Sequence, residues 1–89
     1  MKTGVIKVSG PTGGTFPLAL AADGETLRII DIRGGQGLRE RLASRGLGLG
    51  SLVRVAQTEG PGGMVLHSGG SRIALGMGMA YRILVQAEG

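Results

Sequence analysis

The stretch LRERLASRGLGLGS, residues 38–51, decides how the rest of the chain is interpreted. Its first half is charged, and Leu38 and Leu42 stand four residues apart, which places both side chains on one face of an α-helix. Its second half has glycines at alternate positions, beginning with Gly46. We therefore predict a helix from about residue 36 to residue 45, followed by a glycine-rich loop.

The order of the elements separates two interpretations of these glycines, a phosphate-binding loop and a helix terminator. A phosphate-binding fingerprint places its glycines after a strand and before a helix, because the phosphate lies at the helix N-terminus. Here the glycines follow the helix. Gly46 stands where a residue in the left-handed conformation ends a helix, and Gly50 fits a turn into the next strand. The GPTGGT run at 10–15 also lacks the Lys-Ser/Thr pair of a P-loop. Both segments are therefore interpreted as structural elements and not as phosphate-binding loops.

Short apolar segments on both sides of the helix predict β-strands. The predicted strands are TFPLAL (15–20), LRIIDIR (27–33), SLVRVAQ (51–57), MVLHS (64–68), SRIAL (71–75) and YRILVQ (81–86). Gly24 marks a turn, Gly69 and Gly70 match a two-residue type I′ hairpin, and GMGMA (76–80) matches one helical turn. Five to six short strands, with one helix after the first long strand, describe a mainly β protein, a small SH3-like barrel.

Length and composition bound the organisation of the chain. Its 89 residues predict one barrel domain over 15–89, preceded by an N-terminal extension (1–14) that is either flexible or an added strand. The sequence has no cysteine, which excludes disulfides and thiolate metal sites. Its apolar runs are far shorter than the roughly 20 residues that cross a bilayer, so the chain is expected to be cytosolic and not membrane-spanning.

The segments LRIIDIRGG, LRERLASRGLGLGS and GGMVLHSGGSRIALGMGMAYRILV together resemble the FeoA family of ferrous iron transport accessory proteins over roughly residues 16–87. The matching positions, in the order and spacing of the family, are Gly24, Arg41–Leu42, Gly46–Leu47, Gly50, Gly62–Gly63, Ile73–Ala74–Leu75, Met79–Ala80, Ile83 and Val85. Two positions depart from the family pattern. Leu49 stands where the family usually has proline, and GMGM (76–79) replaces more charged residues.

The resemblance implies a function as well as a fold. It implies a FeoA-like, SH3-like barrel without enzymatic activity, located in the cytoplasm and held at the inner face of the membrane through its partner. That partner would be the FeoB-type ferrous iron transporter, through its cytosolic GTP-binding domain. The chain would then be an interaction module that assists or regulates ferrous iron uptake. Related barrels at the C-terminus of iron-dependent repressors leave a transcription-regulatory module as an alternative.

His67 is the one candidate metal ligand, and it stands within a predicted strand. A metal site usually needs three or four convergent ligands, so a structural or surface histidine is the favoured interpretation. The fold could bring Asp31 or Glu59 close, which leaves weak divalent metal binding open. No tightly bound cofactor is expected. The serines and scattered carboxylates form no catalytic pattern, so the sequence predicts no enzyme.

The candidate residues for binding a partner lie on the helix, on the following loop and at the start of the last helical turn. They are Arg39, Arg41, Arg45, Leu47, Leu49, Met77 and Met79. Arginine pairs with carboxylates in a planar, bidentate way, so the cluster predicts a docking surface for an acidic partner. The alternative interpretation is a solvated polar face. Of the methionines, Met77 is expected to be the exposed one, because glycines flank it.

A basic nucleic-acid-binding barrel is the second interpretation, because ten Lys and Arg against six Asp and Glu give a net charge of +4. Barrels that bind single strands stack bases on several aromatic side chains. This chain has only Phe16 and Tyr81, and Phe16 is expected to be packed. Nucleic acid is therefore disfavoured as a partner. A homo-oligomer through an exposed sheet edge stays open.

Overall fold

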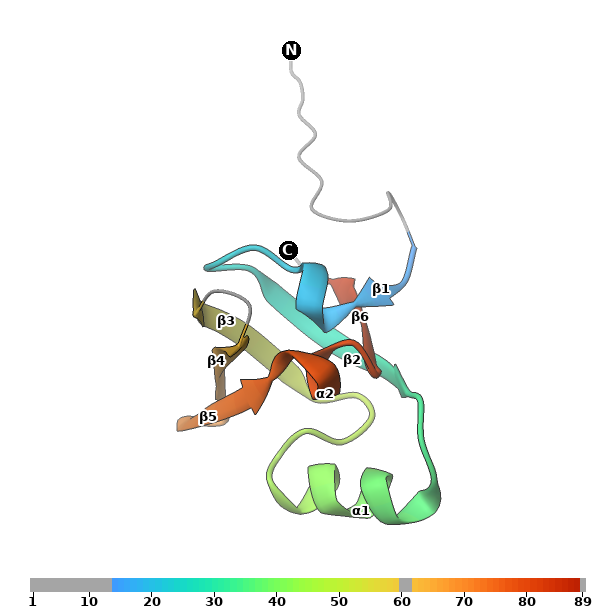
Figure 1. Cartoon of the computed structure of the whole chain (residues 1–89). Helices are drawn as coiled ribbons and strands as arrows, with labels where there is room; N and C mark the ends of the chain where they lie inside the picture. Colours follow the sequence, from blue (N-terminus) through green and yellow to red (C-terminus); the bar gives the residue numbers. More distant parts are fainter. Residues whose placement is uncertain (1–13, 60–61, 89) are drawn as a thin grey trace.

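The computed structural model describes residues 14–59 and 62–88. These residues form one antiparallel sheet of six strands in the order β1-β6-β2-β3-β4-β5 (Figure 1). The expected N-terminal extension, 1–14, lies outside the described residues except for its last residue. The strands are β1 (Phe16–Pro17), β2 (Thr26–Ile32), β3 (Leu52–Glu59), β4 (Gly63–Ser68), β5 (Ser71–Gly76) and β6 (Ile83–Ala87). The helices are a 3-10 turn η1 (Leu18–Leu20), α1 (Gln36–Ser44) and α2 (Met77–Ala80). The mainly β prediction, with one longer helix after the first long strand, is confirmed.

Two β-bulges curve this sheet around its core. The register between β2 and β6 shifts between Ile29 and Asp31, and that between β3 and β4 shifts between Val55 and Gln57. A bulge adds one residue to one strand, which bends the strand and reverses the side-chain alternation beyond it. This is why Ile29 and Ile32 are both buried while Ile30 is exposed. The apolar run in β2 is therefore only partly buried.

The first predicted strand is shorter than expected. Only Phe16 and Pro17 pair with β6, opposite Val85 and Leu84, and the chain then enters the 3-10 turn η1. Proline has no N–H to donate, so it commonly stands at the edge of a sheet and ends the pairing there. The last strand also starts later than predicted, because the Tyr81 and Arg82 amides donate to α2 carbonyls instead.

The C-terminal end of α1 shows how Gly46 terminates the helix. The Gly46 N–H donates to the Ala43 carbonyl at 3.0 Å, and the Leu47 N–H donates to the Leu42 carbonyl at 2.8 Å. These two bonds define a Schellman motif, in which a left-handed residue satisfies the last helical carbonyls. Gly46 has a φ of 88° and Gly50 a φ of 85°. The architectural interpretation of both glycines is confirmed.

The Gly46→Ala variant tests this assignment. Its new Cβ would meet only the Ser68 hydroxyl, at an ordinary 3.6 Å, so the penalty comes from the positive φ. We expect the free energy of unfolding to fall by about 1 to 2 kcal/mol, measured by denaturant unfolding. The control is Gly37→Ala, inside α1 with open space around it. That change is expected to stabilise the protein by up to about 1 kcal/mol. Equal effects of the two substitutions would contradict the assignment.

A candidate partner-binding groove

An apolar groove lies between α1 and the segment formed by β5 and α2. Its apolar lining is Leu38, Leu42, Ala74, Leu75 and Met79, and Arg41, Ser44, Arg45 and Gly76 complete it. We call it the α1–β5 groove. It encloses about 480 Å³. Figure 1 shows α1 set apart from the sheet and facing β5 and α2, which is how segments far apart in sequence come to share one groove.

The position of α1 beside the sheet is fixed by its apolar face and by one arginine. Leu42 is buried in the core and Leu38 packs against it, as their spacing predicted. Arg39 reaches back to β2, where its Nη2 donates to the Asp31 carboxylate at 3.2 Å and to the Ile32 carbonyl at 2.9 Å. Arg39 therefore ties α1 to β2, and its charge is paired with that of Asp31 in this structure.

Arg41 and Arg45 differ from Arg39 in having no such partner. Both side chains are exposed on α1 and its C-cap, and both line the groove. Within residues 14–59 and 62–88 the ion pairs are Arg28–Glu88 and Arg39–Asp31, so neither Arg41 nor Arg45 is neutralised. The groove thus combines an apolar floor with two unpaired positive charges at its rim.

Leu47 is where the sequence prediction was wrong. It was expected to contact a partner, but its side chain is 0% exposed and belongs to the core. The physical reason is the Schellman motif, whose residue after the glycine commonly packs against the last helical turn. The sequence already assigned Gly46 as the left-handed residue. The packing that commonly accompanies such a glycine would therefore have predicted that Leu47 is buried.

Of the remaining predicted contact residues, one lies in the groove, one packs against the core and one is exposed on the loop after α1. Met79 is half-buried and lines the groove. Met77, expected to be exposed, is instead half-buried and packed against the core. Leu49 is 56% exposed, but it lies outside the groove lining. Pattern reasoning missed Ala74 and Leu75 as groove residues, since their place beside α1 depends on tertiary structure.

His67 lies in surroundings that do not suit a cation. It is half-buried on β4, directly opposite Arg54 on β3 and Arg72 on β5. Side chains directly opposite one another share a face of the sheet, so His67 stands between two positive charges. Asp31, one of the suggested partners, is paired with Arg39. Among the described residues there is no group of three or more His, Cys, Asp or Glu that could hold a metal ion.

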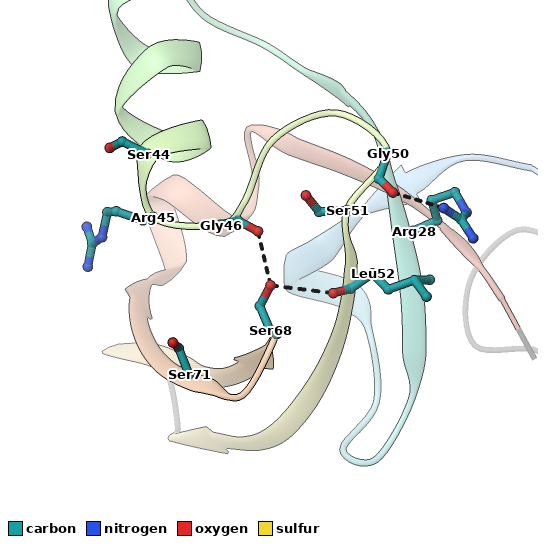
Figure 2. Close-up of a pocket in the computed structure, with 10 residues that line it drawn as sticks. Arg28, Ser44, Arg45, Gly46, Gly50, Ser51, Leu52, Ser68 and Ser71 are labelled. Atoms are coloured by element: carbon teal, nitrogen blue, oxygen red, sulfur yellow. Dashed lines mark hydrogen bonds between the residues drawn. The ribbon is translucent and has the colours of Figure 1, made fainter.

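A second, polar hollow beside the loop 46–51 is part of the scaffold (Figure 2). The Ser68 hydroxyl donates to the Gly46 carbonyl at 3.0 Å, and it lies 3.5 Å from the Leu52 carbonyl. Arg28 donates to the Gly50 carbonyl at 2.9 Å. Figure 2 shows that Arg45 extends away from these contacts. The hydrogen bonds tie the loop to β2 and β4, and this fixes the C-terminal end of α1.

Arg28 also holds the C-terminal end of the chain. Its Nε and Nη2 donate to the two carboxylate oxygens of Glu88, each at 3.1 Å. This hydrogen bonding, together with the opposite charge, lowers the pKa of Glu88 below its ordinary 4.5. A carboxyl group with a lowered pKa stabilises the fold above its unfolded pKa, and loses that effect as the pH falls through the folded value. The contribution is therefore fully present above about pH 4.5 and is lost as the pH falls from there through the lowered folded pKa.

An NMR titration of the Glu88 carboxyl group checks this pair. We expect a midpoint below 4.5 in the native protein and a return toward the ordinary value in Arg28→Gln. The matched control is Arg33→Gln, which removes an exposed arginine outside the pair. An unchanged midpoint in Arg28→Gln would show that the pair does not persist in solution.

No helix among residues 14–59 and 62–88 has the length and apolar character needed to cross a membrane. The fold defines a class of protein, the small SH3-like barrels. That class contains a particular family. The FeoA domain family matches residues 16–87. The chain belongs to the FeoA family, whose members are non-enzymatic and are associated with ferrous iron transport.

Similar proteins agree with this assignment. The putative Fe(2+) transport protein A of Methanocaldococcus jannaschii is 37% identical over 71 residues, which cover 80% of this chain and 85% of that protein. The crystal structure of an iron uptake regulatory protein, FeoA, superimposes with a TM-score of 0.76 at 32% identity, over 82% of this chain and 97% of the other. A manganese-dependent transcriptional repressor gives a TM-score of 0.74 at 28% identity, over 88% of this chain and 44% of the repressor.

Proposed function

We propose that this protein is a cytoplasmic interaction module that assists or regulates ferrous iron uptake by binding the cytosolic GTP-binding domain of a FeoB-type transporter. The observation that carries the proposal is the α1–β5 groove, an apolar cleft bordered by Arg41 and Arg45. Family membership supplies the association with ferrous iron transport. The groove supplies a surface of the right kind for a protein partner.

The chemistry of the groove favours an acidic protein partner. Interfaces typically combine a buried apolar centre with a polar rim, and arginine is enriched among the residues that carry binding energy. Leu38 and Met79 offer partly buried apolar surface, while Arg41 and Arg45 offer charges that no described residue neutralises. A partner that brings carboxylates to the rim gains charge pairs without first breaking any ion pair in this protein.

The nucleic-acid alternative has less support in the structure. Phe16 is 3% exposed, so it cannot stack on a base. Tyr81, which is 54% exposed, is then the only aromatic side chain left for stacking. A single ring is not the platform that single-strand binding uses.

The proposed mechanism is equilibrium coupling between two binding events. If the module binds one nucleotide state of the GTP-binding domain more tightly, it shifts the transporter toward that state by the ratio of the two affinities. Such couplings typically amount to about 5- to 150-fold. The module needs no chemistry of its own to act in this way, which agrees with a non-enzymatic family.

Calorimetric titration of the transporter's cytosolic GTP-binding domain with this protein tests the proposal. The titration is run once with GDP and once with a non-hydrolysable GTP analogue. We expect saturable binding in both series, with an affinity that differs at least about fivefold between them. Equal affinities would remove the coupling mechanism. No binding in either state, at low salt and high concentration, would remove this domain as the partner.

A further inference from the structure

The groove is bordered by a strand edge that pairs with nothing in the described structure. β5 is the last strand in the sheet order, and among the described residues it pairs with β4 alone. Gly69 and Gly70, with φ values of 57° and 88°, form the two-residue turn between these strands. In such a hairpin the flanking residues, here Ser68 and Ser71, exchange backbone hydrogen bonds.

The hairpin register then fixes which backbone groups of β5 face outward. Hydrogen-bonded and non-hydrogen-bonded pairs alternate along an antiparallel pair of strands. Ile73 and Leu75 therefore bond to β4, as Ser71 does, while Arg72 and Ala74 direct their N–H and C=O groups away from it. The Gly76 N–H points the same way. No turn, loop or cap hydrogen bond within the described part of the chain uses these three amides.

Among the described residues, this edge carries one charged side chain, Arg72, but none of the other devices that usually protect edge strands. Proteins block open edges with proline, bulges or a covering segment, or they keep such strands very short. β5 spans six residues, its register with β4 has no shift, and it contains no proline. The C-terminal half of β5, residues 74–76, lines the α1–β5 groove. Ala74 and Gly76 lie on the side of the groove opposite α1. An added strand here would have backbone partners on one side and apolar surface beside it.

We infer that the groove takes an extended, acidic segment of the partner protein, which pairs with β5 as a seventh strand. This inference rests on the proposed function for the partner's identity and adds the form in which the partner binds. A strand is favoured over a helix because only an extended backbone can satisfy the outward N–H and C=O groups of Arg72 and Ala74. Alternate apolar side chains of the segment contact Leu38 and Met79. Its carboxylates pair with the arginines of the rim.

Charge also distinguishes this occupant from a second copy of the chain. Two copies joined edge to edge through β5 would bring two sets of Arg41, Arg45 and Arg72 together in a protein whose net charge is +4. Like charges at an interface oppose association. An acidic segment meets the same arginines with opposite charge, so the partner is favoured over the second copy.

Ala74→Pro tests the added strand directly. Proline at this exposed position removes the outward N–H and places its ring where the added strand would lie, while the bonds of Ile73 and Leu75 to β4 remain. We expect affinity for the transporter's cytosolic GTP-binding domain to fall at least tenfold. Ala74→Ser is the comparison at the same position: because it keeps the N–H, its affinity should fall much less than that of Ala74→Pro.

Amide hydrogen exchange on the native protein gives a second readout that does not depend on how the proline variant folds. On addition of the same domain, exchange should slow at Arg72, Ala74 and Gly76. The amides of Ile73 and Leu75, already bonded to β4, should be protected before addition. Saturable binding without this protection would overturn the added strand and leave the proposed function intact. No binding would overturn both, and the same protection in the protein alone at high concentration would assign the edge to a second copy.

Discussion

Leu47→Ala is expected to lower the free energy of unfolding by about 3 kcal/mol, within the 2–5 kcal/mol usual for removing a buried leucine side chain. The side chain is fully buried in the main core cluster, directly after the Schellman glycine. Truncation leaves a cavity and removes the apolar contact that accompanies this helix end. The measurement is urea unfolding followed by circular dichroism.

The control for this result is Leu49→Ala, two residues along the same loop. Leu49 is 56% exposed, so its truncation should change the stability by no more than about 0.5 kcal/mol. If the two variants were equally stable, Leu47 would be a surface residue, as the sequence pattern first suggested, and the Schellman assignment would be wrong.

Reversing both rim charges, Arg41→Glu/Arg45→Glu, is expected to weaken binding of the GTP-binding domain by about 100-fold, which corresponds to about 2.7 kcal/mol. Each substitution replaces an attraction to the partner's carboxylates with a repulsion. The effect should shrink as salt is raised, because exposed charges are screened over about 8 Å at physiological ionic strength. Titration calorimetry at two salt concentrations measures both quantities.

The matched control is Arg33→Glu/Arg54→Glu, which makes the same change in net charge outside the groove. It should weaken binding much less, by a factor below about ten, since only long-range attraction is lost. The neutral pair Arg41→Gln/Arg45→Gln should fall between the native protein and the reversal. Equal losses from the two reversals would show that overall charge, not the groove, determines binding.

Local patterns were enough to predict the elements. Leucine spacing predicted α1, the position of Gly46 after the helix predicted its end, and Gly69-Gly70 predicted the β4–β5 turn. Each of these rests on residues close together in sequence, whose backbone preferences act locally. The predicted strand ends that were wrong lie where one residue changes the backbone hydrogen bonding. Pro17, for example, which follows Phe16, ends the pairing of β1 with β6.

The groove could not be predicted in the same way. Arg39, Arg41 and Arg45 look equivalent in the sequence. Only the fold shows that Arg39 pairs with Asp31, while the other two form no ion pair with a described residue. The outward edge of β5 likewise depends on which strands become neighbours. These features arise from contacts between distant segments, which a charge or spacing pattern does not encode.

The most direct test of the groove as the partner-binding surface is an NMR titration of the ¹⁵N-labelled protein with the cytosolic GTP-binding domain. We predict saturable amide shift changes that concentrate at Arg41, Arg45, Ala74 and Met79. The amides of Arg54 and Thr58, on β3 outside the groove, should stay close to their free positions. Changes centred on β3, with the groove amides unmoved, would contradict the account.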